Sequence, residues 1–421
     1  SFGGRGYKGN YNYKTSNFNQ ILAYENVFGK DHNFSAKLGH EYYQYTENYL
    51  EGQKTRFFDT KNPELLNGGQ MESIESYKVT HNIEGYFAMA DYDYAHKYYL
   101  SAAFRRDGTS RFKQRWGNFW SVGAGWRISS EKFMEGTKSW LNDLKLRASY
   151  GTQGNENILP GYMYGYTPYV DQYTVTWDGS QLGYTTAFYG NPDLTWEKQK
   201  TLDVGIDFRL FDRVYGSFEY FTRRTDDMLF QRPLAASGGR PYNWENIGSM
   251  RNNGVELEVN VDIFNKPDFK WTVTLLGSHY SNKILTLPEE NKENGITSGL
   301  FNLREGKSRY EYYTYEYAGM DEKGNAMWYT DEKDDNGNVI GKTTTTKYSE
   351  ATKYFLGKQA LPDFNGGFNT TFNYKGFDLS IATAFQLGGW AYDYDYLDGM
   401  SSSFYVGHNK DMWKTFNPET G

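Results

Sequence analysis

Three arginines around a glycine, in "RRDGTSRF" at residues 105–112, are the first residues whose types could do chemistry. Arg105, Arg106 and Arg111 could bind a phosphate, because guanidinium groups form paired hydrogen bonds with phosphate oxygens. The alternative is a hairpin tip, in which Asp107 and Gly108 supply the turn and the arginines pair with nearby carboxylates. The sequence favours the hairpin tip.

A second candidate is the acidic, glycine-containing segment "DEKDDNGNVIG" at residues 331–341. A calcium loop of the EF-hand type needs oxygen ligands at its third and seventh positions and a glutamate at its twelfth. Here Lys333 and Gly337 occupy the third and seventh positions, and "TTTTK" follows where the glutamate should be. We therefore predict a solvated hairpin turn.

Catalytic and metal-binding patterns are weak throughout the chain. The 6 His are scattered without metal-ligand spacing, there is no Cys, and neither a G-x-S-x-G elbow nor a phosphate-binding P-loop occurs. Carboxylates are so abundant that pairs at glycosidase distance would arise by chance. We expect no enzyme, no catalytic residue, no cofactor and no metal site.

Aromatic residues in long polar segments are the strongest candidates for ligand binding. Flat apolar rings with polar tips suit sugar rings or peptide side chains. The alternatives are packing of each loop on itself and contact with a partner protein. Trp196 directly precedes an expected strand and is predicted to be structural. The candidates are Trp177, Tyr184, Trp244, Trp390, Tyr392, Tyr394 and Tyr396.

Composition limits the elements that could position these residues. The formal charge is -7 with a pI near 5.6 and no block of Lys or Arg, which argues against a nucleic-acid partner. The mean hydropathy is -0.80, and no apolar run approaches the roughly 20 residues of a membrane-spanning helix. Any membrane role must therefore use strands.

Strand patterning is clearest in "LDVGIDFRLFDRVYGSFEYF", residues 202–221. Apolar and polar residues alternate there with the period of two that defines a strand. "VELEVNVDIF", residues 255–264, repeats the pattern. We predict that one face of these strands meets lipid, through Leu202, Val204, Ile206, Phe208, Val255, Leu257 and Val259. The other face would line an aqueous lumen, through Asp203, Asp207, Glu256 and Glu258.

Connections between the expected strands alternate in length. Tight links near 94–97, 211–213, 265–269 and 375–376 alternate with long polar segments at 47–77, 152–196, 225–250 and 287–307. Aromatic residues flank almost every tight link, as at a membrane–water boundary. A soluble antiparallel sandwich would also alternate, but the longest segments exceed its usual strand length of about 5 to 6 residues. The pattern favours an all-β, transmembrane antiparallel fold.

The strand pattern predicts about 14 strands and no internal repeat of fixed period. They lie near 7–14, 18–29, 32–46, 76–93, 97–107, 117–129, 143–152, 197–210, 213–229, 251–264, 269–286, 308–319, 366–374 and 377–388.

Several stretches resemble the SusC/RagA-type family of TonB-dependent outer-membrane transporters of Bacteroidota. They occur in the family's order and spacing, and they are "KYYLSAAFRRDGTSRF", "WGNFWSVGAGWRIS", "WLNDLKLRASYGTQGN", "GNPDLTWEKQKTLDVGIDF", "NIGSMRNNGVELEVN" and "LPDFNGGFNTTFNYKGFDLS". The resemblance implies a multi-pass β-barrel of 22 strands in the cell outer membrane. It also implies an N-terminal plug domain, a TonB-contacting segment and a SusD-type surface lipoprotein as lid.

On this resemblance, residues 1–421 are expected to form part of one barrel domain, without the plug, the TonB box or the closing strands. The first residues, "SFGGRGYKGN", lack the pattern of a signal peptide. The implied function is import of oligosaccharides or peptides, powered by TonB-ExbB-ExbD through the missing N-terminal region. Two alternatives stay open: a non-transporting structural subunit of a larger outer-membrane complex, and a soluble carbohydrate-binding β-protein.

Overall fold

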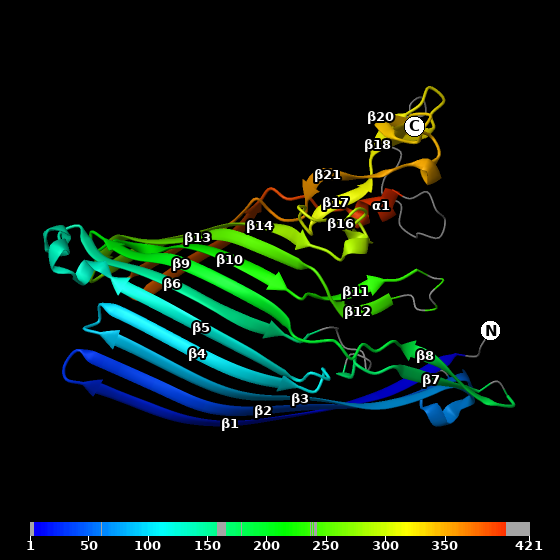
Figure 1. The fold of residues 1–421 in the computed structure, drawn as a ribbon, viewed down its shortest axis with the longest axis horizontal. Helices are drawn as coiled ribbons and strands as arrows, with labels where there is room; N and C mark the ends of the chain where they lie inside the picture. The colour runs from blue at the N-terminus through cyan, green and yellow to red at the C-terminus, as the bar shows by residue number, and fades with distance from the viewer. Residues whose placement is uncertain are drawn as a thin grey trace. The chain divides into compact units, whose positions relative to one another are not determined.

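The computed structural model of the chain describes residues 4–59, 61–157, 166–177, 179–235, 237, 239 and 242–400 (Figure 1). Strands dominate this described part. Within it, no helix combines the length and the apolar character needed to span a membrane. The chain divides into two compact units, Ser1–Ser249 and Met250–Gly421, each of which is described separately below.

The first unit is built on eight long antiparallel strands in the order β1-β2-β3-β4-β5-β6-β9-β10. Sequence neighbours pair directly, except that β6 pairs with β9 across an intervening hairpin. The strands are β1 (Arg5–Phe28), β2 (His32–Phe57), β3 (Gly68–Tyr94), β4 (Tyr98–Thr109), β5 (Trp116–Arg127), β6 (Leu141–Asn155), β9 (Glu197–Leu210) and β10 (Val214–Asp226).

Tight turns close one end of this sheet, the left end in Figure 1. Ala95 and His96 both have φ of 54°, and Phe211 and Asp212 have φ of 54° and 55°. Two consecutive left-handed residues match the right-handed twist of paired strands, so such turns join strands without splaying them. The predicted links at 94–97 and 211–213 are therefore confirmed. Between β5 and β6 the connection is longer and contains the 3₁₀ helices η2 (Ile128–Ser130) and η3 (Lys132–Thr137).

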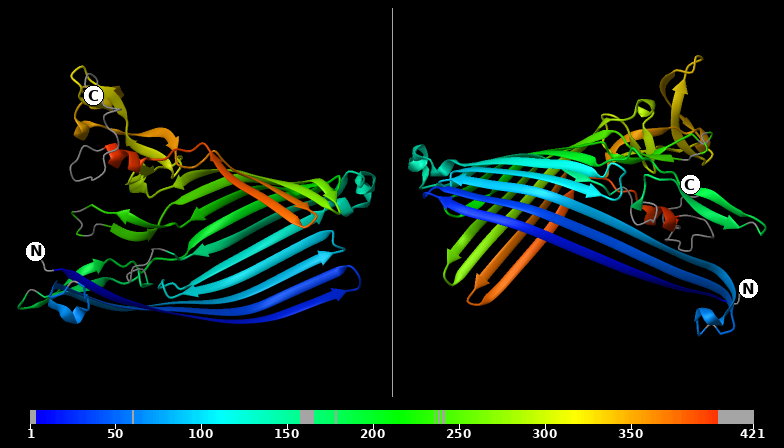
Figure 2. Two further views of the ribbon diagram at one scale, coloured as in Figure 1. Left: turned by 180° about the vertical axis from the view of Figure 1, so that it is seen from behind. Right: turned by 60° about the horizontal axis from the view of Figure 1, so that its bottom comes forward.

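The strands β1, β2 and β3 continue well beyond the ends of β4 and β5 (Figure 2). Their pairing runs without a break from His32↔Tyr94 to Gln53↔Ser73. The prediction of a long loop at 47–77 was wrong, since only residues 58–67 connect the two strands, with η1 (Leu65–Asn67) among them. The segments 7–14 and 18–29, predicted as two strands, form the single strand β1. Continuous backbone pairing with β2 explains both differences.

Two small hairpins lie at the opposite, open end of the first unit. β7 (Gln172–Trp177) pairs with β8 (Leu182–Phe188), and β11 (Leu229–Pro233) pairs with β12 (Tyr242–Asn246). A buried cluster at this end holds the hairpins against the sheet. It consists of Phe112, Phe119, Phe188, Leu194, Trp196 and Trp244.

The second unit contains four long strands in the order β13-β14-β22-β23. They are β13 (Ser249–Lys266), β14 (Phe269–Thr286), β22 (Phe364–Tyr374) and β23 (Phe377–Leu387). The predicted tight links at 265–269 and 375–376 are present, and Lys375 and Gly376 have φ of 45° and 90°. In the described residues the long strands thus number eight and four, against the 14 predicted.

Short strands fill the long connections of the second unit. The segment 308–319, predicted as one long strand, is divided between β17 and β18, which belong to different small sheets. One sheet contains β15 (Ile296–Ser298), β16 (Phe301–Leu303), β17 (Glu311–Tyr315) and β21 (Lys353–Gln359), and the other contains β18 (Tyr317–Met320), β19 (Ala326–Lys333) and β20 (Val339–Thr345). The remaining elements are η6 (Glu289–Asn291), η7 (Tyr348–Glu350) and α1 (Tyr394–Met400).

Candidate functional site

The pairing register of the first unit builds one continuous apolar face. Residues opposite one another in antiparallel strands point to the same side of the sheet. Val204 lies opposite Ala148 on one side and Tyr220 on the other. The row extends through β3, β4, β5, β6, β9 and β10 as Tyr92, Leu100, Ala124, Ala148, Val204 and Tyr220. Leu202, Ile206 and Phe208 lie on this same face of β9.

The opposite face of the same sheet is polar. Its adjacent row runs through Glu25, Ser35, Asp91, Ser101, Gly123, Ser149 and Asp203. The sheet therefore separates two solvents. This placement matches the faces predicted for Asp203, Asp207 and the apolar residues of β9.

Arg147 is the centre of an ion-pair network on the polar face. Its guanidinium lies 3.3 Å from Asp203 Oδ1 and 3.2 Å from Asp207 Oδ1, and it also donates a hydrogen bond to Glu219. Gly205 stands opposite Arg147, and a side chain there would overlap the guanidinium. Three carboxylates around one cation leave the network with an excess of negative charge.

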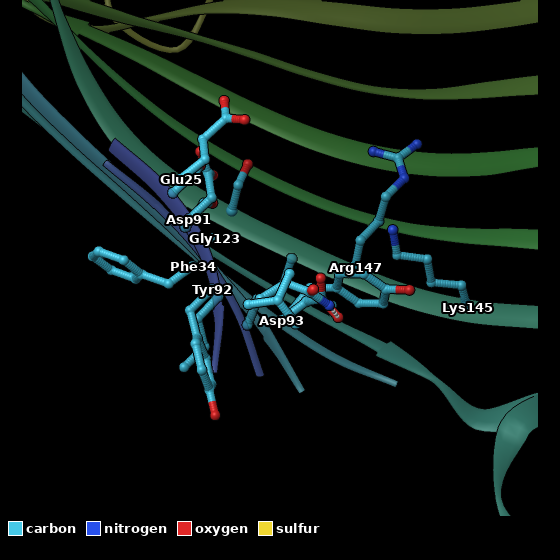
Figure 3. Close-up of a pocket in the computed structure, with 18 of the residues that line it drawn as sticks. Glu25, Phe34, Asp91, Tyr92, Asp93, Gly123, Lys145 and Arg147 are labelled. Carbon is cyan, nitrogen blue, oxygen red and sulfur yellow. Dashed lines mark hydrogen bonds between the residues drawn. The ribbon is translucent and has the colours of Figure 1, made fainter. Parts of the chain in front are cut away.

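A hollow of about 810 Å³ lies on this polar face near the tight turns. Figure 3 shows Glu25 and Asp91 on one side of it and Lys145 and Arg147 on the other. Gly123 keeps the hollow open, because a Cβ atom at this position would lie 2.6 Å from Ser101 Oγ. Charged groups of both signs that face open space can bind water or polar solutes.

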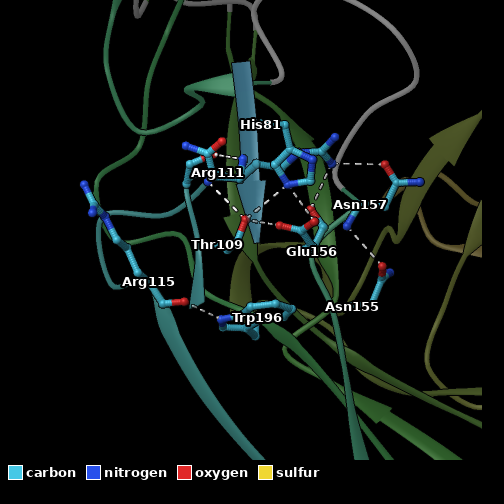
Figure 4. Close-up of polar contacts among 10 residues, drawn as sticks. His81, Thr109, Arg111, Arg115, Asn155, Glu156, Asn157 and Trp196 are labelled. Atoms are coloured by element: carbon cyan, nitrogen blue, oxygen red, sulfur yellow. Dashed lines mark hydrogen bonds and ion pairs between the residues drawn. The ribbon is translucent and has the colours of Figure 1, made fainter. Parts of the chain in front are cut away.

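A buried polar network joins strand ends to the connection that follows β6 (Figure 4). His81 Nε2 lies 2.9 Å from Glu156 Oε1, and the Thr109 hydroxyl also donates to this carboxylate. Burial alone would raise the pKa of the Glu156 carboxyl, but the hydrogen bonds from His81 and Thr109 outweigh it and lower the pKa. Arg111 donates to the Glu156 carbonyl and to Asn157 Oδ1. The network therefore anchors the first residues of this connection.

The arginines of 105–112 are engaged within the chain. Arg105 donates to Asp107 at 2.7 Å and to Glu41 at 2.6 Å. Asp107 and Gly108 lie within β4, so the turn predicted at these two residues is displaced to 110–115. Pairing with carboxylates, the favoured alternative to phosphate binding, is confirmed for Arg105.

The acidic segment 331–341 forms the tip of the β19–β20 hairpin. Asp334 Oδ1 accepts hydrogen bonds from the backbone amides of Asn336 and Asn338, at 2.9 Å each. The Asn338 side chain and these amides lower the pKa of Asp334. The predicted hairpin turn is thus confirmed. Within the described residues, no group of three or more potential ligand side chains could hold a metal ion.

Trp244 differs from the other candidate aromatic residues because it is buried. Only 6% of it is exposed, and it packs in the aromatic cluster with Trp196. The Trp196 indole donates to the Arg115 carbonyl at 2.9 Å, in agreement with its predicted structural role. Trp244 lies on β12 and not in an open loop, so its ring is closed to a ligand in this structure.

Trp177 and Tyr184 lie on one face of the β7–β8 hairpin. They are 66% and 73% exposed. Register pairs Trp177 with Leu182 and Tyr184 with Val175, so four large apolar side chains share this face. Isolated two-stranded hairpins are marginal in water, and an exposed apolar face of this kind is typical of a contact surface.

The remaining candidates belong to the second unit. Trp390 is exposed, and Lys358 Nζ lies 4.1 Å from the centre of its ring. Tyr392 and Tyr394 are exposed neighbours with ring centres 4.6 Å apart, and Tyr396 on α1 is exposed too. On β13, Val255, Leu257 and Val259 alternate with Glu256 and Glu258, which places the two sets on opposite faces of the strand.

One aromatic cluster was not predicted from the sequence. Tyr11, Tyr13, Tyr45, Tyr49 and Tyr77 gather on the polar face at the extended ends of β1, β2 and β3. The available signal was the spacing of two residues between Tyr11 and Tyr13, which places both rings on one face of a strand.

Comparison with known proteins assigns the fold to a family. The family described as "TonB dependent receptor-like, beta-barrel" matches residues 1–419, so the chain belongs to it. TonB-dependent receptor P3 of Formosa agariphila is 30% identical over 95% of this chain and 41% of its own length. TonB-dependent receptor SusC of Bacteroides thetaiotaomicron is 27% identical over 93% of this chain and 39% of its own length.

A solved structure agrees with this assignment. The RagAB peptide transporter is 26% identical with a TM-score of 0.83, over 98% of this chain and 46% of the transporter chain. The predicted SusC/RagA-type resemblance and the all-β transmembrane barrel fold are therefore confirmed. The chain spans about two fifths of the length of the curated relatives that it matches. The family consists of receptors and transporters, not enzymes.

Proposed function

We propose that the chain is the barrel part of an active importer in the cell outer membrane. It would take up oligosaccharides or peptides together with a SusD-type surface lipoprotein and TonB-ExbB-ExbD. The observation that carries the proposal is the continuous apolar row from Tyr92 to Tyr220, because soluble proteins rarely expose large contiguous apolar surface. Lipid would cover this face, which argues against a soluble carbohydrate-binding protein.

The polar face would line the passage of the ligand. Groups such as Asp203, Asp207 and Arg147 exchange hydrogen bonds with water readily, so a polar ligand can pass without losing all of its own. Glu256 and Glu258 would do the same on β13. No covalent step is required of these residues, so the barrel needs neither a cofactor nor a catalytic residue.

Two contact regions would serve recognition. The face of the β7–β8 hairpin that carries Trp177 and Tyr184 would meet the lipoprotein lid, because its apolar side chains lack cover in the chain itself. In the second unit, Trp390, Tyr392 and Tyr394 would contact the ligand through their ring faces. The similarity to a peptide transporter favours peptides as the first ligands to test.

An uptake assay tests the proposal. Cells that encode the full-length protein, cells lacking its gene and cells lacking TonB are incubated with fluorescently labelled mixtures of short peptides or of oligosaccharides. We expect one mixture to accumulate only in cells that have both the gene and TonB. Equal accumulation in all three strains would refute import.

A further inference from the structure

Five tyrosines enclose a buried carboxylate where β1, β2 and β3 extend beyond the rest of the sheet. Glu47 is 8% exposed, and it accepts hydrogen bonds from the Tyr45 hydroxyl at 2.8 Å and the Tyr77 hydroxyl at 2.6 Å. Tyr13 lies directly opposite Glu47 in the register. The cluster, named here the Glu47 cluster, consists of Tyr11, Tyr13, Tyr45, Tyr49 and Tyr77 around Glu47.

The rings of the Glu47 cluster form a connected wall. Tyr11 stacks on Tyr49 with ring centres 4.4 Å apart, and Tyr49 lies 5.0 Å from Tyr77. On the other side, Tyr13 stacks with Tyr45 at 6.2 Å. Tyr11 and Tyr13 are more than half exposed, so the wall is open to a ligand from the polar face.

Negative charge on this wall lacks a compensating cation. Glu51 and Glu75 lie opposite each other on the same face as Glu47. In the part of the chain that the structure describes, none of these three carboxylates takes part in an ion pair. The nearby Arg111 lies over the Tyr166 ring and donates its hydrogen bonds to Glu156 and Asn157.

We infer that the Glu47 cluster binds a cationic group of the imported ligand, such as a lysine or arginine side chain of a peptide. Aromatic faces carry partial negative charge and attract cations, and a desolvated carboxylate nearby strengthens this attraction. A neutral sugar would need free hydrogen-bonding groups, whereas both Glu47 oxygens are already occupied by tyrosine hydroxyls. The inference rests on the proposed import function and specifies its ligand.

The test uses the full-length protein in detergent and two labelled peptides. One is Ala-Lys-Ala-Lys-Ala-Lys, and the other has Gln in place of each Lys. We expect Tyr13→Ala and Glu47→Gln to weaken binding of the Lys peptide about five- to thirtyfold, measured by fluorescence anisotropy, with no change for the Gln peptide. Tyr13→Phe keeps an aromatic face and should bind like the wild type. Tyr24→Ala, on the opposite face of β1, is the matched control.

Equal binding of the two peptides by the wild type would overturn the inference, as would equal weakening of both peptides in Tyr13→Ala. If Glu47→Gln fails to assemble, Tyr11→Ala and Tyr13→Ala carry the test, because both side chains are exposed. Continued TonB-dependent uptake of a neutral mixture alongside such a failure would refute the cation subsite alone and leave import intact.

Discussion

Val204 and Asp203 are neighbours in the chain, yet the pleat of β9 directs them to opposite faces of the sheet. Val204 lies in a row of apolar side chains, whereas Asp203 lies 3.3 Å from Arg147. If lipid covers the apolar row, Val204→Arg should cost about 2 to 4 kcal/mol of folding free energy. The cost is measured by folding of the full-length barrel into lipid vesicles across a urea series.

Ser149→Arg is the matched control for this substitution. Ser149 is exposed on the polar face, directly opposite Asp203, which can pair with a new cation. The control should change the folding free energy by less than about 1 kcal/mol. An equal loss of folding free energy in Val204→Arg and Ser149→Arg would contradict the assignment of the faces.

Glu156 makes a pH-dependent contribution at the same scale. Its folded-state pKa lies below the ordinary value of 4.5, because His81 and Thr109 donate to the carboxylate. A depressed pKa stabilises the folded state above pH 4.5, and this stabilisation is lost as the pH falls through the folded-state pKa. Hydrogen exchange of the segment around Glu156, corrected for intrinsic rates, should therefore show falling protection below pH 4.5.

Glu156→Gln separates this effect from general acid unfolding. The amide cannot ionise, so the variant should show reduced protection already at pH 7 and little further loss on acidification. A loss of about 1.5 to 3 kcal/mol is expected for a hydrogen bond to a charged group. Identical pH profiles in the wild type and Glu156→Gln would show that this carboxylate does not anchor the connection.

At the scale of elements, the hairpins β7–β8 and β11–β12 present tryptophans in opposite environments. Trp244 on β12 is buried in the aromatic cluster, and Trp177 on β7 is largely exposed. We expect Trp244→Ala to destabilise the first unit by about 3 to 5 kcal/mol, because it leaves a cavity. Trp177→Ala should stay within about 0.5 kcal/mol. Denaturant unfolding of the detergent-purified protein measures both, and similar losses would contradict the burial described here.

Period-two alternation was sufficient to predict the paired strands β9 and β10 and their turn at 211–213, because each strand has one face in each solvent. Alternation could not delimit β2 and β3. Residues 47–57 are polar on both sides, and long-range backbone pairing with β1 and β3 extends the strand through them. The Tyr-rich segment 308–319 has strand propensity, but contacts distant in sequence divide it between two small sheets.

Site residues were predictable only where local pattern determines the face. Asp203 and Leu202 follow from alternation, whereas the burial of Trp244 depends on Phe112, Phe188 and Leu194, which are distant in sequence. The Glu47 cluster was missed for the same reason, since β1, β2 and β3 each contribute part of it.

At the scale of the whole molecule, the family and the two-faced sheet support an outer-membrane importer that works with a lid. The chain corresponds to about two fifths of its curated relatives, so plug, lid and TonB contacts belong to the proposal. A non-transporting subunit of a larger complex would show the same sheet with the same two faces. Partners therefore distinguish the two functions better than any residue of the barrel does.

The most direct measurement is to extract the full-length protein from outer membranes in mild detergent and to identify by mass spectrometry the proteins that co-purify with it. The account predicts a single SusD-type lipoprotein in equal amount, lost in a variant carrying Trp177→Ser and Tyr184→Ser but retained in Thr176→Ser on the opposite face of the hairpin. Recovery of several unrelated envelope proteins without such a lipoprotein, or of the protein in the soluble fraction, would contradict it.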